Sequence, residues 1–177
     1  GELEWSGDLN ITNDSAQPLL VTGVVRGGNG ININGPGIVS FDGNNTYSGT
    51  TVIDSGSAGP GIARARGQHA LGRGGLVVIG QSGNATTARL EMENGALVSN
   101  PTNLNGRTND SAGIVNNSGT NTISGTVSAQ SGGDRYWIRS DAGQLVLSGA
   151  NGGGVAINSG ATGTRNFTLR GAGDGAV

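Results

Sequence analysis

Few residues of this chain have the types and spacing that catalysis requires. His69 is the only histidine, so no second imidazole exists for a triad or a metal pair. Glu91 and Glu93 lie two residues apart in the alternating segment 89–93, which places both carboxylates on the same side of an expected strand. Such a pair can hydrolyse glycosides. We expect instead a solvated acidic surface that pairs with Arg89.

The segment 134–141 is the second candidate, because it combines acidic and basic side chains with two neighbouring aromatic rings. Tyr136 and Trp137 can stack on a sugar, with Arg135 and Arg139 beside them. A strand whose aromatic residues cover a corner of the fold explains the same pattern. We therefore keep this segment as a candidate glycan contact and expect no catalytic residues in it.

Composition excludes several classes of partner. The net charge of −2 gives a nucleic-acid partner no electrostatic support. The chain has no cysteine, and hence no disulfide or thiolate metal site. The chain has no stretch of about 18 apolar residues, so its sequence does not predict a membrane-spanning helix. No phosphate-binding or dinucleotide-binding motif is present, so we expect no cofactor.

The elements that must position these residues are short strands. Apolar clusters of two to four residues recur along the chain, as in 19–21, 76–79 and 145–147, and glycine or asparagine separates them. Period-2 alternation in many of these segments is typical of half-buried strands. No segment has helical spacing. The 36 glycines serve as turn residues, since they tolerate positive φ.

We count about fourteen strands, and coils of about 20 to 25 residues would then give about seven or eight turns of a parallel β-solenoid. Residues 1–177 are expected to form one such domain or a segment of a longer repeat protein. The polar stretch 100–110 is expected to be a loop that projects from one corner. The glycine-rich tail 171–177 is expected to fray or to dock elsewhere.

The stretch 43–52, Gly-Asn-Asn-Thr-Tyr-Ser-Gly-Thr-Thr-Val, and the step Ala70-Leu71-Gly72 about twenty residues later carry a family resemblance. Together they resemble the autotransporter-associated β-strand repeat, also called the passenger-associated transport repeat. The resemblance implies a right-handed parallel β-helix outside a bacterial cell. It also implies structural positions in turns and side-chain ladders, which are Asn45, Thr46, Tyr47, Gly49, Thr50, Ala70, Leu71 and Gly72.

The sequence thus favours a secreted, non-enzymatic structural protein at the bacterial cell surface. Solenoids expose unpaired strands at both ends, so we expect copies to associate end to end into a filament or matrix, or the ends to continue into further repeats. Two alternatives remain open. One is an adhesin that binds a glycan or a host surface through 100–110 or through Tyr136 and Trp137. The other is a polysaccharide-active β-helix enzyme.

Overall fold

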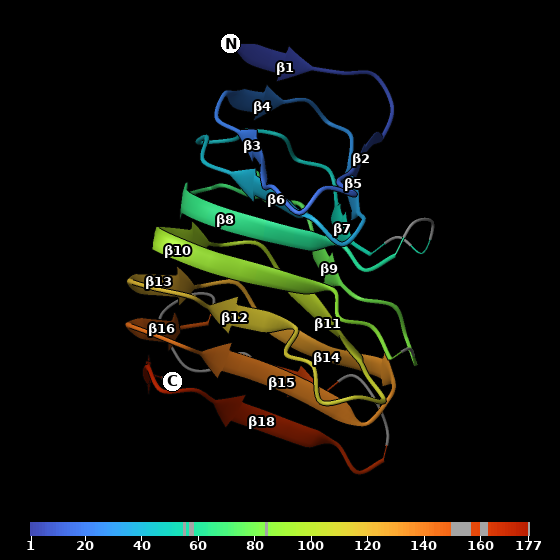
Figure 1. Cartoon of the computed structure of the whole chain (residues 1–177), viewed down its shortest axis with the longest axis vertical. Coiled ribbons are helices and arrows are strands. Elements are labelled where there is room, and N and C mark those ends of the chain that lie inside the picture. Colours follow the sequence, from blue (N-terminus) through green and yellow to red (C-terminus); the bar gives the residue numbers. More distant parts are fainter. Residues whose placement is uncertain (55, 57–58, 84, 150–156, 160–162, 177) are drawn as a thin grey trace.

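The computed structural model of the chain consists of β-strands and turns, and it has no helix in the residues that it describes. Those residues are 1–54, 56, 59–83, 85–149, 157–159 and 163–176. The strands lie across the long axis of the molecule and stack from β1 near one end to β18 near the other (Figure 1). The paired strands run parallel, and they form a β-solenoid with three faces. The predicted all-β, parallel β-helix class is confirmed.

Over the described residues, the first face is a sheet of seven strands. These are β2 (Leu9–Thr12), β5 (Ile31–Asn34), β7 (Thr51–Ile53), β9 (Val77–Ile79), β11 (Thr102–Gly106), β14 (Val127–Gly132) and β17 (Ile157–Ser159). Six successive turns of the chain connect them, so the solenoid makes about six turns. The expectation of seven or eight was slightly too high. The last of these turns, from Val127 to Ile157, is longer than the expected upper bound of about 25 residues.

The second face begins with β3 and ends with β18, and its long middle strand is shared with the third face. Its strands are β3 (Leu19–Val21), β6 (Ile38–Phe41), β8 (Ile62–Gln68), the first half of β10 (Arg89–Val98), β12 (Ile114–Asn116), β15 (Arg135–Ser140) and β18 (Asn166–Arg170). β10 turns the corner at Asn94 and Gly95, where φ is 58° and 73°. Asparagine and glycine are the residues that adopt this left-handed conformation most readily.

The third face combines regular strands with two segments outside the named strands. Its strands are β1 (Glu2–Glu4), β4 (Val24–Arg26), the second half of β10, β13 (Thr120–Ile123), β16 (Gln144–Leu147) and β19 (Asp174–Ala176). Between β4 and β10, the segments 45–48 and 69–73 continue the stack. The Thr46 amide donates to the Val25 carbonyl at 2.9 Å, and the Arg73 amide donates to the Tyr47 carbonyl at 2.8 Å.

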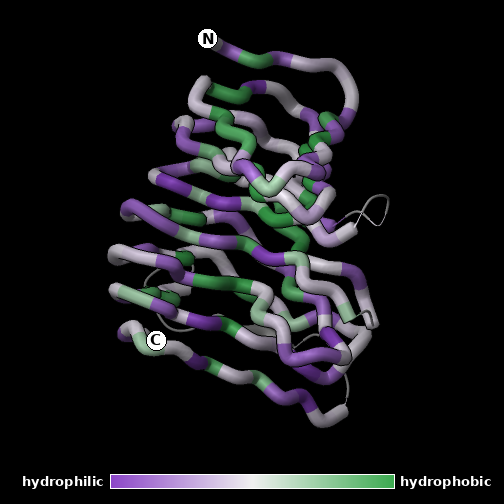
Figure 2. The backbone as a smooth tube through the Cα atoms, viewed as in Figure 1, coloured by the Kyte–Doolittle hydropathy of each residue, from purple (hydrophilic) through white to green (hydrophobic). Residues whose placement is uncertain are grey.

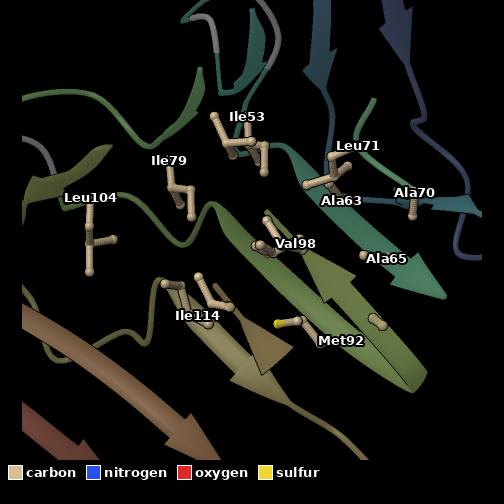
Figure 3. Close-up of a cluster of buried hydrophobic side chains, with 14 of the residues drawn as sticks. Ile53, Ala63, Ala65, Ala70, Leu71, Ile79, Met92, Val98, Leu104 and Ile114 are labelled. Carbon is tan, nitrogen blue, oxygen red and sulfur yellow. The ribbon is translucent and has the colours of Figure 1, made fainter. Parts of the chain in front are cut away.

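The core is a set of register-aligned columns of apolar side chains. On the first face, parallel pairing places Ile33, Ile53, Ile79 and Leu104 in consecutive rungs. All four are fully buried, and the last three lie in succession in Figure 3, with Val98 among the side chains beside them. Figure 2 shows hydrophobic and hydrophilic residues alternating along many strands. Burial of each large side chain contributes about 1.5–3 kcal/mol, so a thin coil acquires a continuous core by stacking.

Two expectations about irregular segments are wrong. Residues 102–106 form strand β11 of the first face instead of a projecting loop. Thr102 and Leu104 point inward and are fully buried. In this strand the inward positions are occupied by threonine and leucine, and the asparagines between them point outward. The tail does not fray over its described part, since Asp174–Ala176 pairs with Gln144–Val146 of β16. Val177 lies outside the described residues.

Candidate functional site

Asn45 occupies an internal position that links three successive coils. Its side-chain Oδ1 accepts a hydrogen bond from the Val25 amide at 2.8 Å, and its Nδ2 donates to the Ala70 carbonyl at 2.6 Å. The side chain is fully buried. Because the segment 45–48 lacks regular strand geometry, these bonds satisfy backbone groups of the neighbouring rungs that would otherwise be unpaired in the interior. The geometry at Asn45 is that of a structural ladder.

Other residues of the motif have divided roles. Tyr47 is fully buried, its hydroxyl lies 2.7 Å from Thr51 Oγ1, and its ring packs against Trp5 with the centroids 6.2 Å apart. Burial raises the pKa of the Tyr47 phenol well above its usual value, although the hydrogen bond with Thr51 acts in the opposite direction. These contacts and its burial make Tyr47 a core residue. Thr46, by contrast, is exposed, and Thr50 is half-buried.

The second motif forms the next rung of the same face. Ala70 and Leu71 are fully buried and project toward the core (Figure 3). Gly72 has φ of 74° and packs against the Tyr47 ring and carbonyl. His69 has φ of 55°, and its carbonyl accepts from the amides of Asn45 and Gly72 at 3.3 and 2.9 Å. His69 thus lies at a corner of the fold.

Charged side chains on the outer side of the second face form a network, here called the charged ladder, that consists of Asp42, Arg64, Arg66, Arg89, Glu91 and Glu93. Arg64 Nη2 lies 2.6 Å from Glu91 Oε2, and Arg89 Nη2 lies 2.7 Å from Glu91 Oε1. Glu93 contacts Arg64 at 3.3 Å and Arg66 at 3.5 Å. The parallel register creates the Arg64–Glu91 pair, since the two residues are direct partners in β8 and β10. Arg89 and Glu91 lie two residues apart on β10 itself.

Glu91 is only 4% exposed, so the expected solvated acidic surface is wrong at this position, although the expected pairing with Arg89 is present. Burial alone raises the pKa of this carboxyl, but the hydrogen bond from Arg64 and the charges of Arg89 and Arg64 outweigh it, and the pKa lies below its usual value. A carboxyl that stays ionised cannot donate a proton as a glycosidase general acid does.

The candidate glycan residues divide between the two sides of β15. Tyr136 is fully buried, and its hydroxyl donates to the Gln130 carbonyl. The hypothesis of a glycan contact is therefore wrong for Tyr136, because strand alternation turns it into the core, where its ring stacks on Phe167. Trp137 is half-buried and points outward, between Arg135 and Arg139. These three side chains share one outer surface.

Arg107 is a buried cation that no pattern in the sequence indicated. Its guanidinium donates to the carbonyls of Thr86, Ala88, Ser111 and Ala112. Burial lowers its pKa to about 10, even though the charge of Asp54 acts to raise it. No local signal marks this residue, since its partners come from the turn that precedes β10 and the turn that precedes β12.

Asp54 is the second buried charge that the sequence did not reveal. Its carboxylate accepts from Gln81 Nε2 at 3.0 Å and from Thr86 Oγ1 at 2.6 Å. All three residues line an open cavity of about 300 Å³. The positive φ of 75° at Asp54 places it in a turn after β7. This carboxylate is held by hydrogen bonds within the protein, as expected of a structural group.

No group of three or more His, Cys, Asp or Glu residues in the described part of the chain is arranged to hold a metal ion. No helix in that part is long and apolar enough to cross a membrane. Comparison with known proteins gave no matching family model and no significant match among curated proteins or solved structures. The resemblance to the autotransporter-associated repeat consequently stays a prediction.

Proposed function

We propose that this chain is a structural β-solenoid of the bacterial cell surface whose rungs continue, end to end, into an extracellular filament or matrix. The observation that carries the proposal is the contrast between the two ends of the solenoid and its sides. Leucines that are aligned in register with buried core residues are exposed at both ends. The second face instead carries a dense network of ion pairs on its outer side. The motif resemblance supports the extracellular location.

At the first end, Leu3 and Leu19 are aligned with core residues of the next rung, and among the described residues no preceding rung covers them. Leu3 is aligned with Val25 and Leu19 with Val39, both of which are fully buried in the next rung. Leu19 itself is 45% exposed. Covering such side chains with another rung removes apolar surface from water, which favours association by about 25 cal/mol per Å².

The opposite end has a matching apolar surface. Leu169 of β18 is aligned with Ile138 and is 52% exposed. Together with Leu145 and Leu147, these residues line an open cavity of about 290 Å³. Strands at such edges also present unpaired backbone groups, which form a template for further parallel pairing. A second copy, or a further coil of the same polypeptide, would cover both kinds of surface.

Two adjacent leucines provide a matched test of end-to-end association. Leu19 is on the core side of β3, where it is aligned with Val39. Leu20 is 57% exposed and is on the outer side of the same strand, aligned with Ser40. We expect Leu19→Lys to abolish assembly, measured by analytical ultracentrifugation and negative-stain microscopy over a concentration series. Leu20→Lys carries the same charge at a neighbouring exposed site, and filaments should survive it.

In fibre diffraction, the filaments should give a reflection at about 4.8 Å along their axis, because the rungs stack in that direction. A wild-type protein that stays monomeric at every concentration would overturn the assembly part of the proposal. Equal loss of assembly in the Leu19 and Leu20 variants would place the contact on the sides of the solenoid.

The adhesin alternative is the second candidate, and the outward Trp137 with its neighbouring arginines is the observation that favours it. The enzyme alternative has less support from the residues on which it depended. Glu91 and Glu93 are both ion-paired within the charged ladder, and no catalytic role is proposed for them.

A further inference from the structure

One column of side chains on the outer side of the second face has opposite charges as neighbours in its middle and like charges as neighbours at its end. The parallel register aligns, from β6 to β18, the residues Ser40, Arg64, Glu91, Val115, Arg139 and Arg170. Arg64 and Glu91 are neighbours in this column and form an ion pair. Arg139 and Arg170 are also direct neighbours. Like charges that face each other in a sheet are destabilising, so this end of the column favours an anion.

The existing partners of these two arginines leave them available to a ligand. Arg139 Nε lies 2.7 Å from Asp141 Oδ1, in a pair whose side chains are both more than 40% exposed. Exposed pairs of this kind are weak and readily exchanged. Within the part of the chain that the structure describes, no carboxylate lies within ion-pair distance of Arg170, whose guanidinium carbon lies 4.3 Å from the centroid of the Trp137 ring.

Trp137 gives this surface an aromatic component as well as a cationic one. It is aligned with Thr168 of β18 and lies between Arg135 and Arg139 along β15. Arg170 covers part of the indole, and the ring remains half-buried instead of fully covered. Tryptophan and arginine together are suited to ligands that present both a weakly polar face and an anionic group.

We propose that Trp137, Arg139 and Arg170, here called the Arg–Trp surface, bind an acidic polysaccharide. A sugar ring packs on the remaining exposed part of the indole. The carboxylate or sulfate group of the sugar accepts hydrogen bonds from the two guanidinium groups, for which arginine offers planar, forked donors. Trp137 and Arg139 lie on the outer side of the second face, one rung from the end. Arg170 lies on the terminal strand β18 and also lines the cavity at that end, so the binding test is made on unassembled protein.

An extended polysaccharide fits this surface better than a nucleic acid does. Asp110 and Asp134 lie close to Arg135, at 2.6 and 3.8 Å, so the positive charge is confined to a small area. Nucleic-acid binding rests on contacts with many successive phosphates. A ligand with one anionic group per sugar unit needs only the paired guanidinium groups and the ring.

The test is isothermal titration of the full chain with polygalacturonate, heparin, dextran and an oligothymidylate. We expect saturable binding of an acidic polysaccharide that weakens with added salt, and none of dextran. Preference for polygalacturonate would assign carboxylated sugars, and preference for heparin would assign sulfated ones. Binding of dextran as tight as that of the acidic polymers, or a preference for the oligothymidylate, would overturn the proposal.

Variants then locate the site. Arg170→Ala and Trp137→Ala should each weaken binding by about tenfold. The matched control is Arg73→Ala, which removes another exposed arginine, one that hydrogen-bonds Asn44 on the third face. It should change the affinity less than about twofold. Thermal unfolding verifies that each variant is folded. Equal effects of the Arg73 and Arg170 variants, or no effect of either Arg–Trp variant, would reject the site.

Because the chain has two tryptophans, a Trp5→Phe variant leaves Trp137 as the single tryptophan, whose emission is excited selectively. Its emission should shift on saturation with the acidic polysaccharide, with the same midpoint as the calorimetric titration. An unchanged emission spectrum at saturation would place the ligand elsewhere.

Discussion

Arg64 donates hydrogen bonds from both Nε and Nη2 to a single carboxylate oxygen of Glu91, at 2.9 and 2.6 Å. The two residues are far apart in sequence and meet only because β8 and β10 pair in parallel. Asn117 Nδ2 donates to the same oxygen from the following coil at 3.1 Å. One carboxylate thus links three successive rungs, which makes Glu91 the centre of the charged ladder.

Glu91→Gln should lower the free energy of unfolding by about 1–3 kcal/mol at neutral pH, because it leaves Arg64 and Arg89 facing a neutral group in a largely buried site. Chemical denaturation measures this. The control is Glu2→Gln, which removes an exposed ion pair with Arg26 and should change stability much less.

Wild type and the Glu91→Gln variant should also differ in how their stability depends on pH. The pKa of Glu91 is lower in the folded chain than its ordinary value of 4.5, so its ionised form stabilises the fold above that value. This stabilisation should disappear as the pH falls below 4.5 and through the folded-state pKa. The stability difference between wild type and Glu91→Gln should hence be constant near neutrality and shrink in acid. A difference that grows in acid would contradict the assignment.

Asn45→Ala should destabilise the protein by about 2–5 kcal/mol, because the Val25 amide and the Ala70 carbonyl would both lose a buried partner. Asn45→Asp keeps the acceptor for Val25 but lacks the donor for Ala70, so it should not restore stability. Asn44→Ala, at the exposed neighbouring position, serves as the control and should have little effect. Equal melting temperatures for the Asn44 and Asn45 variants would exclude a ladder role.

Gly49→Ala tests the close approach of two rungs. A Cβ at Gly49 would overlap the backbone of Asn29 and Gly30 in the preceding coil, so we expect a loss of about 1–3 kcal/mol or failure to fold. Gly28→Ala is matched to it, since a Cβ there meets nothing within 4 Å, and its melting temperature should stay within a few degrees of wild type. A stable Gly49→Ala protein would show that the coils are able to separate at this corner.

Arg107→Lys retains the charge but replaces a forked donor by a single ammonium. Arg107 uses Nη1 for the carbonyls of Thr86, Ser111 and Ala112 and Nη2 for the carbonyl of Ala88, and a single ammonium nitrogen cannot occupy both positions. We expect a loss of about 2–4 kcal/mol in urea unfolding. Arg73→Lys, at an exposed site, should be nearly neutral, and similar losses in both variants would argue against the buried network.

The sequence predicted the strand class well and the polar interior poorly. Alternation of apolar residues located most rungs, because a half-buried strand imposes a period of two. It failed at Thr102 and Leu104, where threonine takes an inward position and the surrounding asparagines suggested a loop. The same periodicity, applied to β15, separates the buried Tyr136 from the outward Trp137 once the phase of the strand is known.

The sequence alone determined that this chain forms short β-strands separated by glycine and asparagine, since these properties depend on local alternation and on φ. Only the tertiary structure decided which polar groups are buried and which charges meet. Asn45, Glu91 and Arg107 find their partners in neighbouring coils or turns, and Arg139 and Arg170 become neighbours only through register. In a solenoid, the surroundings of a side chain are set by the rungs above and below it, one full turn away along the chain.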